Sequence, residues 1–382
     1  MLNFEIKKFF LSKKNLVILV MLGLLLVVTH FVRLNSSLNT GPYKLEKIGG
    51  IKYGISKAEE KLQDSSYPED LRVETEERVK DYKRQVKALE SNQFNSYFEI
   101  QNKLNHQYLK YDEKDKQLEE QKKFHQHQID YYNLIKKRRL DFELEPGSQV
   151  HAFGTFINTP LVSMFTSMYL LIFAVLISVQ ISTHFESKEF LFYDFAKISR
   201  QRTLFQKVSA ALLVTFASIL LISAVDIISV GIKNGFGSLN YPGYLKNFKG
   251  AGSPMVPWRV DNMAIPNGQI ILISLSYLFL ILIFLSALGA LFSVLFKKSL
   301  VVVGIIAVFI VGWSLIEQKD YMQAVRRFVP MSYLDPRELL CHPAYLFGKS
   351  SLVVGIVYLA ALSAICFLFS SFLMKKYRVR RL

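Results

Sequence analysis

Six long apolar segments set the limits on what this chain can fold into. The hydrocarbon core of a bilayer is about 30 Å thick, so an apolar helix of about 20 residues can cross it. Hydrophobic residues make up 51% of the 382 residues. The first of these segments, at about 16–34, lacks the small residues of a signal-peptide cleavage site, so we interpret it as a membrane anchor. The segments lie at about 16–34, 159–182, 208–231, 269–296, 300–316 and 351–374. The sequence therefore predicts an all-α polytopic membrane protein with six transmembrane helices.

Positive charge is concentrated in the short segments that flank the apolar ones. The net charge is +16, and residues 1–15, 183–207, 297–298 and 375–382 carry +3, +2, +2 and +5 of it. Cytoplasmic loops of membrane proteins are enriched in Lys and Arg, which sets their orientation. The charge therefore predicts that both termini are cytoplasmic and that the lipid bilayer, not a nucleic acid, is the partner.

The segment 35–156 is too long to be a simple connector between two membrane helices. It carries 21 basic and 21 acidic residues, so its net charge is zero. Pro68 followed by two acids is typical of a helix start. A seven-residue repeat follows, at Tyr97, Leu104, Tyr111, Leu118, His125 and Tyr132. Such a repeat favours a coiled-coil-like seam. We predict an extracytoplasmic helical hairpin of about 68–90 against about 96–143.

Residues 183–207 form a polar and basic segment between the second and third apolar segments. Acids and aromatic residues alternate in it at helical spacing, so a helix here would have an acidic and an aromatic face. These residues include Phe185, Glu186, Glu189, Phe190 and Tyr193. Arg200, Arg202 and Lys207 follow where the chain re-enters the membrane. The segment is either a docking surface for a cytoplasmic partner or an ordinary basic inner loop.

This segment resembles the loop between the second and third membrane helices of ABC-2-type permeases, the transmembrane subunits of bacterial ATP-binding cassette (ABC) exporters. The matching residues are Glu186, Ser187, Lys188, Glu189, Ile198, Ser199, Arg200 and Lys207. A Gly after the acids and a Pro before the Ser-Arg pair, common in the family, are absent. Residues 1–15 resemble the amphipathic elbow helix that begins such permeases, although a basic flank that only orients the first span would carry the same charge.

The resemblance implies a protein of the bacterial plasma membrane that works with other subunits. Two permease subunits, as a homodimer or a heterodimer, would form the pathway, and two cytosolic ABC ATPases that bind ATP and Mg²⁺ would press on residues 183–207. Glu186, Glu189, Phe190 and Tyr193 would form the docking face, and Arg200, Arg202 and Lys207 would fix it to the membrane. Gly348-Lys349-Ser350 ends like a phosphate-binding loop but lacks the earlier Gly. We therefore expect no ATPase site and no bound cofactor in this chain.

Several functions fit this plan. Large outer inserts occur both in family members that resemble sodium exporters and in others that handle peptides, so export of a peptide or amphipathic compound is favoured over export of ions. An alternative of another class is a non-transporting sensor that acts through its outer helices. Mechanotransmission permeases, a third class, usually have four spans.

Asp226 is the one acid well inside an apolar segment. An ionisable group at that depth is costly and is a candidate for the transport pathway, although water can reach it if it lies near the outer end of the span. Small residues in the fourth and sixth segments, among them Gly289 and Gly355, predict close helix packing.

Histidines and cysteines give no support for a metal site or a disulfide. His125 and His127 are separated by one residue, so they point to different sides of a helix and are poorly placed for chelation. Cys341 is expected in an outer loop and Cys366 within the last span. We expect neither a metal ion nor a disulfide.

Overall fold

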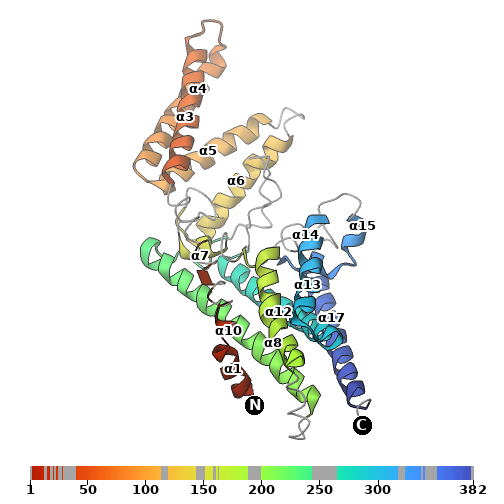
Figure 1. The fold of residues 1–382 in the computed structure, drawn as a ribbon. Helices are drawn as coiled ribbons and strands as arrows, with labels where there is room; N and C mark the ends of the chain where they lie inside the picture. The colour runs from red at the N-terminus through yellow and green to blue at the C-terminus, as the bar shows by residue number, and fades with distance from the viewer. Residues whose placement is uncertain are drawn as a thin grey trace. The chain divides into compact units, whose positions relative to one another are not determined.

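The computed structural model describes most of the chain, and its secondary structure there is helical (Figure 1). One isolated β-bridge, between Pro242 and Pro266, is the exception among the described residues. The described residues are 2–12, 15–17, 20, 23, 24, 28, 40–112, 119–142, 151–157, 161, 163–187, 199–242, 265–316, 323–336, 339 and 351–379.

The chain divides into two compact units, which we describe separately. The transmembrane unit consists of Met1–His30, Thr159–Ser229 and Ile271–Leu382. The insert unit consists of Phe31–Asn158 and Val230–Ile270. Each unit therefore combines segments that are far apart in the sequence.

Five helices are long and apolar enough to cross a membrane. They are α8 (Ser167–Glu186), α10 (Arg200–Asn234), α12 (Asn267–Phe296), the helix Ser299–Ile316, and α17 (Ser351–Val379). The helix Ser299–Ile316 contains α13 (Ser299–Ala307), the π-helical turn η4 (Val308–Gly312) and α14 (Trp313–Ile316). The predicted all-α membrane fold is confirmed, while most of the first predicted span, 16–34, lies outside the described residues.

The second predicted span, 159–182, begins later than expected. A separate short helix, α7 (Ala152–Phe156), precedes it. The backbone N–H and the hydroxyl of Thr166 both donate to the carbonyl of Ser163, at 2.9 and 2.8 Å. This turn from Ser163 to Thr166 directly precedes α8, which starts at Ser167.

Small residues let three of the transmembrane helices approach closely. A Cβ on Gly289 of α12 would lie 2.6 Å from Ser178 Oγ and 3.4 Å from Ser178 Cα on α8. A Cβ on Gly355 of α17 would lie 2.7 Å from Tyr277 Oη and 3.1 Å from the Tyr333 ring. The predicted role of these glycines in helix packing is confirmed.

The chain between the last two spans is fastened to α12 and α17. It contains α15 (Gln323–Arg326) and the 3₁₀ turn η6 (Pro330–Tyr333). Tyr277 Oη donates to the carbonyl of Tyr333 at 2.8 Å, and Tyr358 Oη donates to the carbonyl of Phe328 at 2.7 Å. Both tyrosine hydroxyls beside these apolar helices therefore have a hydrogen-bond partner.

Four helices form the larger part of the insert unit: α3 (Thr40–Gln63), α4 (Glu69–Glu90), α5 (Phe94–Asp112) and α6 (Glu119–Arg138). The predicted helix at about 68–90 is confirmed as α4. The predicted single helix at about 96–143 is wrong, because the described residues of that stretch form two helices, α5 and α6, which pack on each other. Of the seven-residue repeat, Tyr97 and Leu104 on α5 and Tyr132 on α6 are buried, so its described positions lie on two packed helices and not on one continuous seam.

Helix α3 is absent from the prediction because three glycines in its interior, each costing about 1 kcal/mol, argue against it. Its apolar residues explain why it forms. Ile48 is buried in the core of the unit, and Ile51 and Ile55 pack against that core from the following turns. Tertiary packing thus outweighs the low helix propensity of the glycines.

An aromatic core holds the insert unit together. It joins Leu89, Phe98, Tyr131, Ile135 and Phe142 with Tyr241, which follows α10 in the sequence. Tyr131 and Tyr241 share a hydrogen bond between their hydroxyls at 2.7 Å. The chain after α10 is therefore part of this unit and is held in its core.

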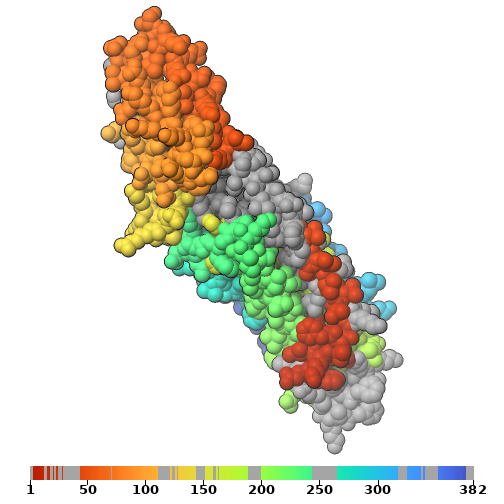
Figure 2. Space-filling view, turned by 90° about the vertical axis from the view of Figure 1, so that its left-hand side faces the viewer, coloured from red at the N-terminus to blue at the C-terminus, as the bar shows by residue number. Residues whose placement is uncertain are grey.

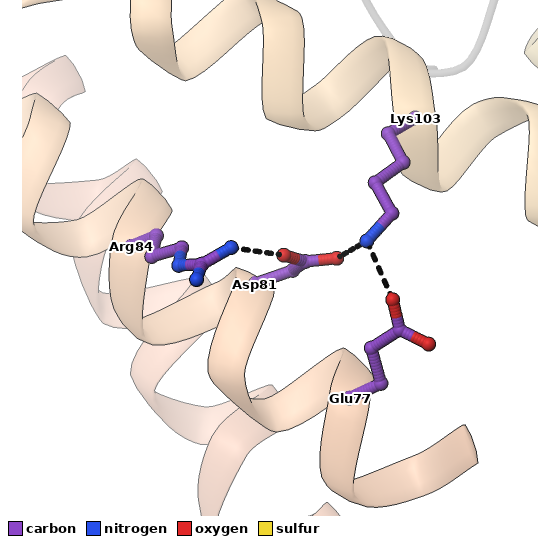
Figure 3. A network of polar contacts seen from close by, with 4 residues as sticks. All are labelled: Glu77, Asp81, Arg84 and Lys103. Atoms are coloured by element: carbon purple, nitrogen blue, oxygen red, sulfur yellow. Dashed lines mark hydrogen bonds and ion pairs between the residues drawn. The ribbon is translucent and has the colours of Figure 1, made fainter.

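Polar groups line the contact between α4 and α5. Asp81, which is 2% exposed, accepts a hydrogen bond from Lys103 at 2.8 Å and pairs with Arg84 at 3.5 Å (Figure 3). Lys103 also donates to Glu77 at 2.7 Å. The bonds to Asp81 and then Glu77 raise the pKa of Lys103, so this contribution to stability is present at neutral pH and is lost as the pH rises through the pKa of Lys103 in the folded chain.

Candidate coupling site

Four of the seven residues predicted to couple to an ATPase are described by the structure. Glu186 is the last residue of α8, and Arg200, Arg202 and Lys207 are in the first turns of α10. Glu189, Phe190 and Tyr193 lie outside the described residues. Their role in docking stays a prediction, whereas the attachment of the two ends of the segment can be described.

Glu186 caps the first turn of α13, the third membrane helix after α8 along the chain. Its Oε1 accepts a hydrogen bond from the backbone N–H of Ser299 at 2.7 Å, and its Oε2 accepts one from the Ser299 hydroxyl at 2.9 Å. Ser299 begins α13, and the first N–H groups of a helix have no partner within it and attract negative charge. Glu186 thus acts on α13 as an N-cap residue would, from the end of a different helix.

The sharp connection before Ser299 makes this contact possible. Lys297 has a φ of 57°, in the left-handed region, and only Lys297 and Lys298 separate α12 from α13. A non-glycine residue in this region is uncommon and is held there by its surroundings. The hairpin between α12 and α13 is therefore fastened to the end of α8.

Replacing Glu186 by Ala should destabilise the chain by about 0.5–2 kcal/mol, the usual cost of removing an N-cap side chain. Ser299→Ala should cost less, because the backbone N–H of residue 299 remains. Thermal unfolding of the two single variants and of the double variant, all in the same detergent, measures the coupling between them. Strictly additive effects would show that the two side chains do not interact.

An ion pair attaches the other end of the segment to α1 (Leu2–Leu11). Lys207 Nζ lies 2.8 Å from Glu5 Oε2, and these side chains are only 7% and 9% exposed. Phe9, one turn after Glu5, is 1% exposed, so one face of α1 is turned inward. The predicted membrane anchor Lys207 therefore binds a carboxylate of the protein, and it holds α1 against α10 (Figure 1).

A third bond attaches the same end to the last span. Gln201 Nε2 donates to the backbone carbonyl of Ser371 on α17 at 3.1 Å. Arg200 is half-buried beside it and Arg202 is exposed. The two ends of the predicted coupling segment are thus fastened to α13, α1 and α17, all within the transmembrane unit.

Asp226 lies farther along α10 and is half-buried. The buried residues Thr215 and Ser223 lie on the same side of the helix, whereas Leu221 and Val225 are mostly exposed. An acid within an apolar segment is expected to face protein or water and not lipid, and Asp226 follows that rule. Its role in a transport pathway stays a prediction.

The predicted histidine and cysteine residues are placed as follows. His125 shares a hydrogen bond with Asn105 Oδ1 at 3.0 Å and stacks on Tyr108. Because a carbonyl oxygen only accepts, His125 Nδ1 is the donor. Cys366 is a free thiol, and Cys341 lies outside the described residues. Within the part of the chain that the structure describes, no three His, Cys, Asp or Glu side chains come close enough together to hold a metal ion.

Sequence reasoning misses two residues of the site, Glu5 and Ser299. Glu5 is the one acid among the first 15 residues. A single acid in a basic segment indicates that it has a specific partner. Ser299 follows two lysines and starts an apolar helix, a typical position for capping. The bonds of Glu186 and Lys207 define the site.

Comparisons of the chain with models of protein families, with characterised proteins and with solved structures found no match.

Proposed function

We propose that this chain is the transmembrane subunit of an ABC exporter of the ABC-2 type. Residues 16–34 would form the first of six spans, and both termini would lie in the cytoplasm of a bacterium. A separate ATPase would bind ATP and Mg²⁺, and a second permease subunit would complete the pathway. The chain itself would carry the surface that receives the motion and the helices that respond to it.

The observation that carries this proposal is the attachment of residues 183–207 at both ends. A segment that transmits a push must be bound to the helices that it moves. Glu186 bonds to the start of α13 at 2.7 and 2.9 Å, and Lys207 bonds to Glu5 of α1 at 2.8 Å. An ordinary inner loop needs neither contact.

These contacts suggest how a movement of the segment would spread. A rigid displacement of the end of α8 would carry the α12–α13 hairpin with it through Glu186. A displacement of the start of α10 would carry α1 through Lys207. Helices that pack tightly move as bodies, so such displacements could switch a pathway between inward- and outward-facing forms.

We propose that the cargo leaves the cell. A peptide or amphipathic compound is favoured and an ion is the alternative, since both kinds of exporter carry large outer inserts. One observation favours the sensor alternative. The insert unit has its own aromatic core, which includes Tyr241 from the chain after α10, so it is built as a folded unit and not as a loose loop.

Purification of the tagged chain from its native membrane in mild detergent tests the proposal. We expect a soluble protein with a phosphate-binding loop to be recovered in near-equal amount. Glu189→Lys should reduce that recovery about ten-fold, since reversing a charge at a docking surface costs about 1.4 kcal/mol or more. Mass spectrometry of the recovered proteins measures both.

Glu60→Lys serves as the matched control, because Glu60 is an exposed acid of the insert unit. It makes the same charge change without touching the coupling segment. Glu186 is left intact in both variants, so the cap on α13 is preserved. Equal ATPase recovery with Glu189→Lys would exclude the docking face. No ATPase with the unaltered chain, together with extracytoplasmic partners, would exclude the exporter and favour the sensor.

A further inference from the structure

Helix α1 has two faces of different chemistry. Glu5 and Phe9, one turn apart, are buried at 9% and 1% exposure. Phe4 and Leu11, two turns apart, are 62% and 81% exposed, and Lys7 between them is also exposed. Residues at this spacing share one side of a helix. The outward face of α1 is therefore apolar and basic, and Glu5, the acid of this helix, lies on the opposite, buried face.

Figure 2 shows the N-terminal residues, in red, at the surface of the transmembrane unit. Two large apolar side chains at such exposure are unfavourable in water. They are favourable where a helix lies in the membrane interface, with apolar side chains in the acyl boundary and lysines reaching the headgroups. Helix α1 directly precedes an apolar segment of membrane-spanning length, which places it near that interface.

The buried ion pair explains why α1 presents this face and not another. A carboxylate beside anionic headgroups would be repelled, and Glu5 is removed from that position by Lys207 at 2.8 Å. The same bond prevents α1 from rotating about its axis. Residues 1–15 carry a net charge of +3, which is complementary to an anionic surface.

We propose that the face formed by Phe4, Lys7 and Leu11 binds anionic phospholipid, with Lys7 on the phosphate groups. Lipid bound there holds α1 in the interface, while Glu5 connects α1 to the start of α10. Lipid composition can therefore act on α10 through α1. This inference depends on membrane insertion and does not depend on the proposed ABC exporter.

The test places the photo-crosslinking residue benzoylphenylalanine at position 11 of the full chain. The protein is reconstituted in vesicles that contain equal amounts of phosphatidylglycerol and phosphatidylcholine, and the crosslinked lipids are identified by mass spectrometry. We expect phosphatidylglycerol to be enriched over phosphatidylcholine. Lys7→Gln should lower that enrichment about five-fold, the effect of about one interfacial charge.

A second position supplies the control. Leu221 on α10 is 69% exposed and lies within the apolar part of the span. The same probe there should crosslink both lipids equally, with or without Lys7→Gln. Equal labelling of both lipids at position 11 would overturn the proposal, and so would crosslinks from position 11 to a second protein chain. Recovery of an ATPase plays no part in this result, so the two proposals can fail separately.

Discussion

Replacing Lys207 by Met should destabilise the packing of α1 on α10 by about 3–5 kcal/mol. The change removes one partner of a buried ion pair and leaves the Glu5 carboxylate, which is 9% exposed, without its ammonium. Stranding a buried charge costs far more than an intact pair contributes, because the desolvation of the remaining group is no longer offset. This is the largest effect that we expect from a single substitution in the coupling site.

Two measurements check this expectation. Hydrogen exchange of residues 2–11 should become faster in Lys207→Met, because α1 can relieve the strain by detaching from α10. The double variant Glu5→Met, Lys207→Met should restore much of the protection, because apolar replacement of a buried pair is often close to neutral. Equal exchange of α1 in the wild type and in Lys207→Met would mean that the pair does not hold this helix.

The same two variants distinguish two roles of the ion pair: holding α1 against α10, and transmitting motion from the coupling segment to α1. If the pair transmits motion from the coupling segment to α1, the apolar double variant keeps that packing while it loses the charge. ATP hydrolysis that responds to cargo should then survive in the double variant and fail in Lys207→Met. Failure in both would indicate that the charges themselves, and not the packing, matter for coupling.

The membrane-spanning part of the fold is well determined by the sequence. Length and apolar content alone identify the spans that became α8, α10, α12, Ser299–Ile316 and α17, because the bilayer demands about 20 apolar residues in each. The start of α8 is the main error. It depends on a turn between Ser163 and Thr166, which no count of apolar residues can reveal.

The insert unit is predicted less well, and the reason is tertiary. A seven-residue repeat cannot distinguish one long helix from two that fold back on each other, since both present the same apolar positions. Here Phe98 of α5 packs with Tyr131 of α6 and with Phe142, which closes the unit. Helix α3 is missed because its glycines lower its helix propensity. It is stabilised by the burial of Ile48 in the core, which only the folded unit provides.

The coupling site shows the same division. Charge and spacing identify Glu186 and Lys207 as important, but not their partners. Ser299, the partner of Glu186, lies 113 residues away along the chain, and Glu5, the partner of Lys207, lies 202 residues away. Pairs that distant form only when the helices pack. The sequence therefore predicts which groups need a partner, and the structure is required to identify that partner.

Replacing Ile135 by Ala should destabilise the insert unit by about 2–5 kcal/mol. Ile135 is 0% exposed on α6, in the aromatic core, so its loss leaves a cavity that surrounding rings fill poorly. Lys137→Ala, two residues away on the exposed side of the same helix, is the control and should change stability by less than about 0.5 kcal/mol. Thermal unfolding of the full chain compares the two.

The cavity should be felt beyond α6 because the core is shared. Tyr241 belongs to the same core and bonds to Tyr131 at 2.7 Å, and Arg138 donates to the carbonyl of Asn240 at 2.7 Å. The amides of residues 235–241 should therefore exchange about 30-fold faster in Ile135→Ala, the factor expected for a loss of about 2 kcal/mol. Faster exchange confined to α5 and α6 would show that this stretch is held elsewhere. If residues 235–241 respond, the chain that leaves α10 shares the stability of the insert unit, because the same core holds both.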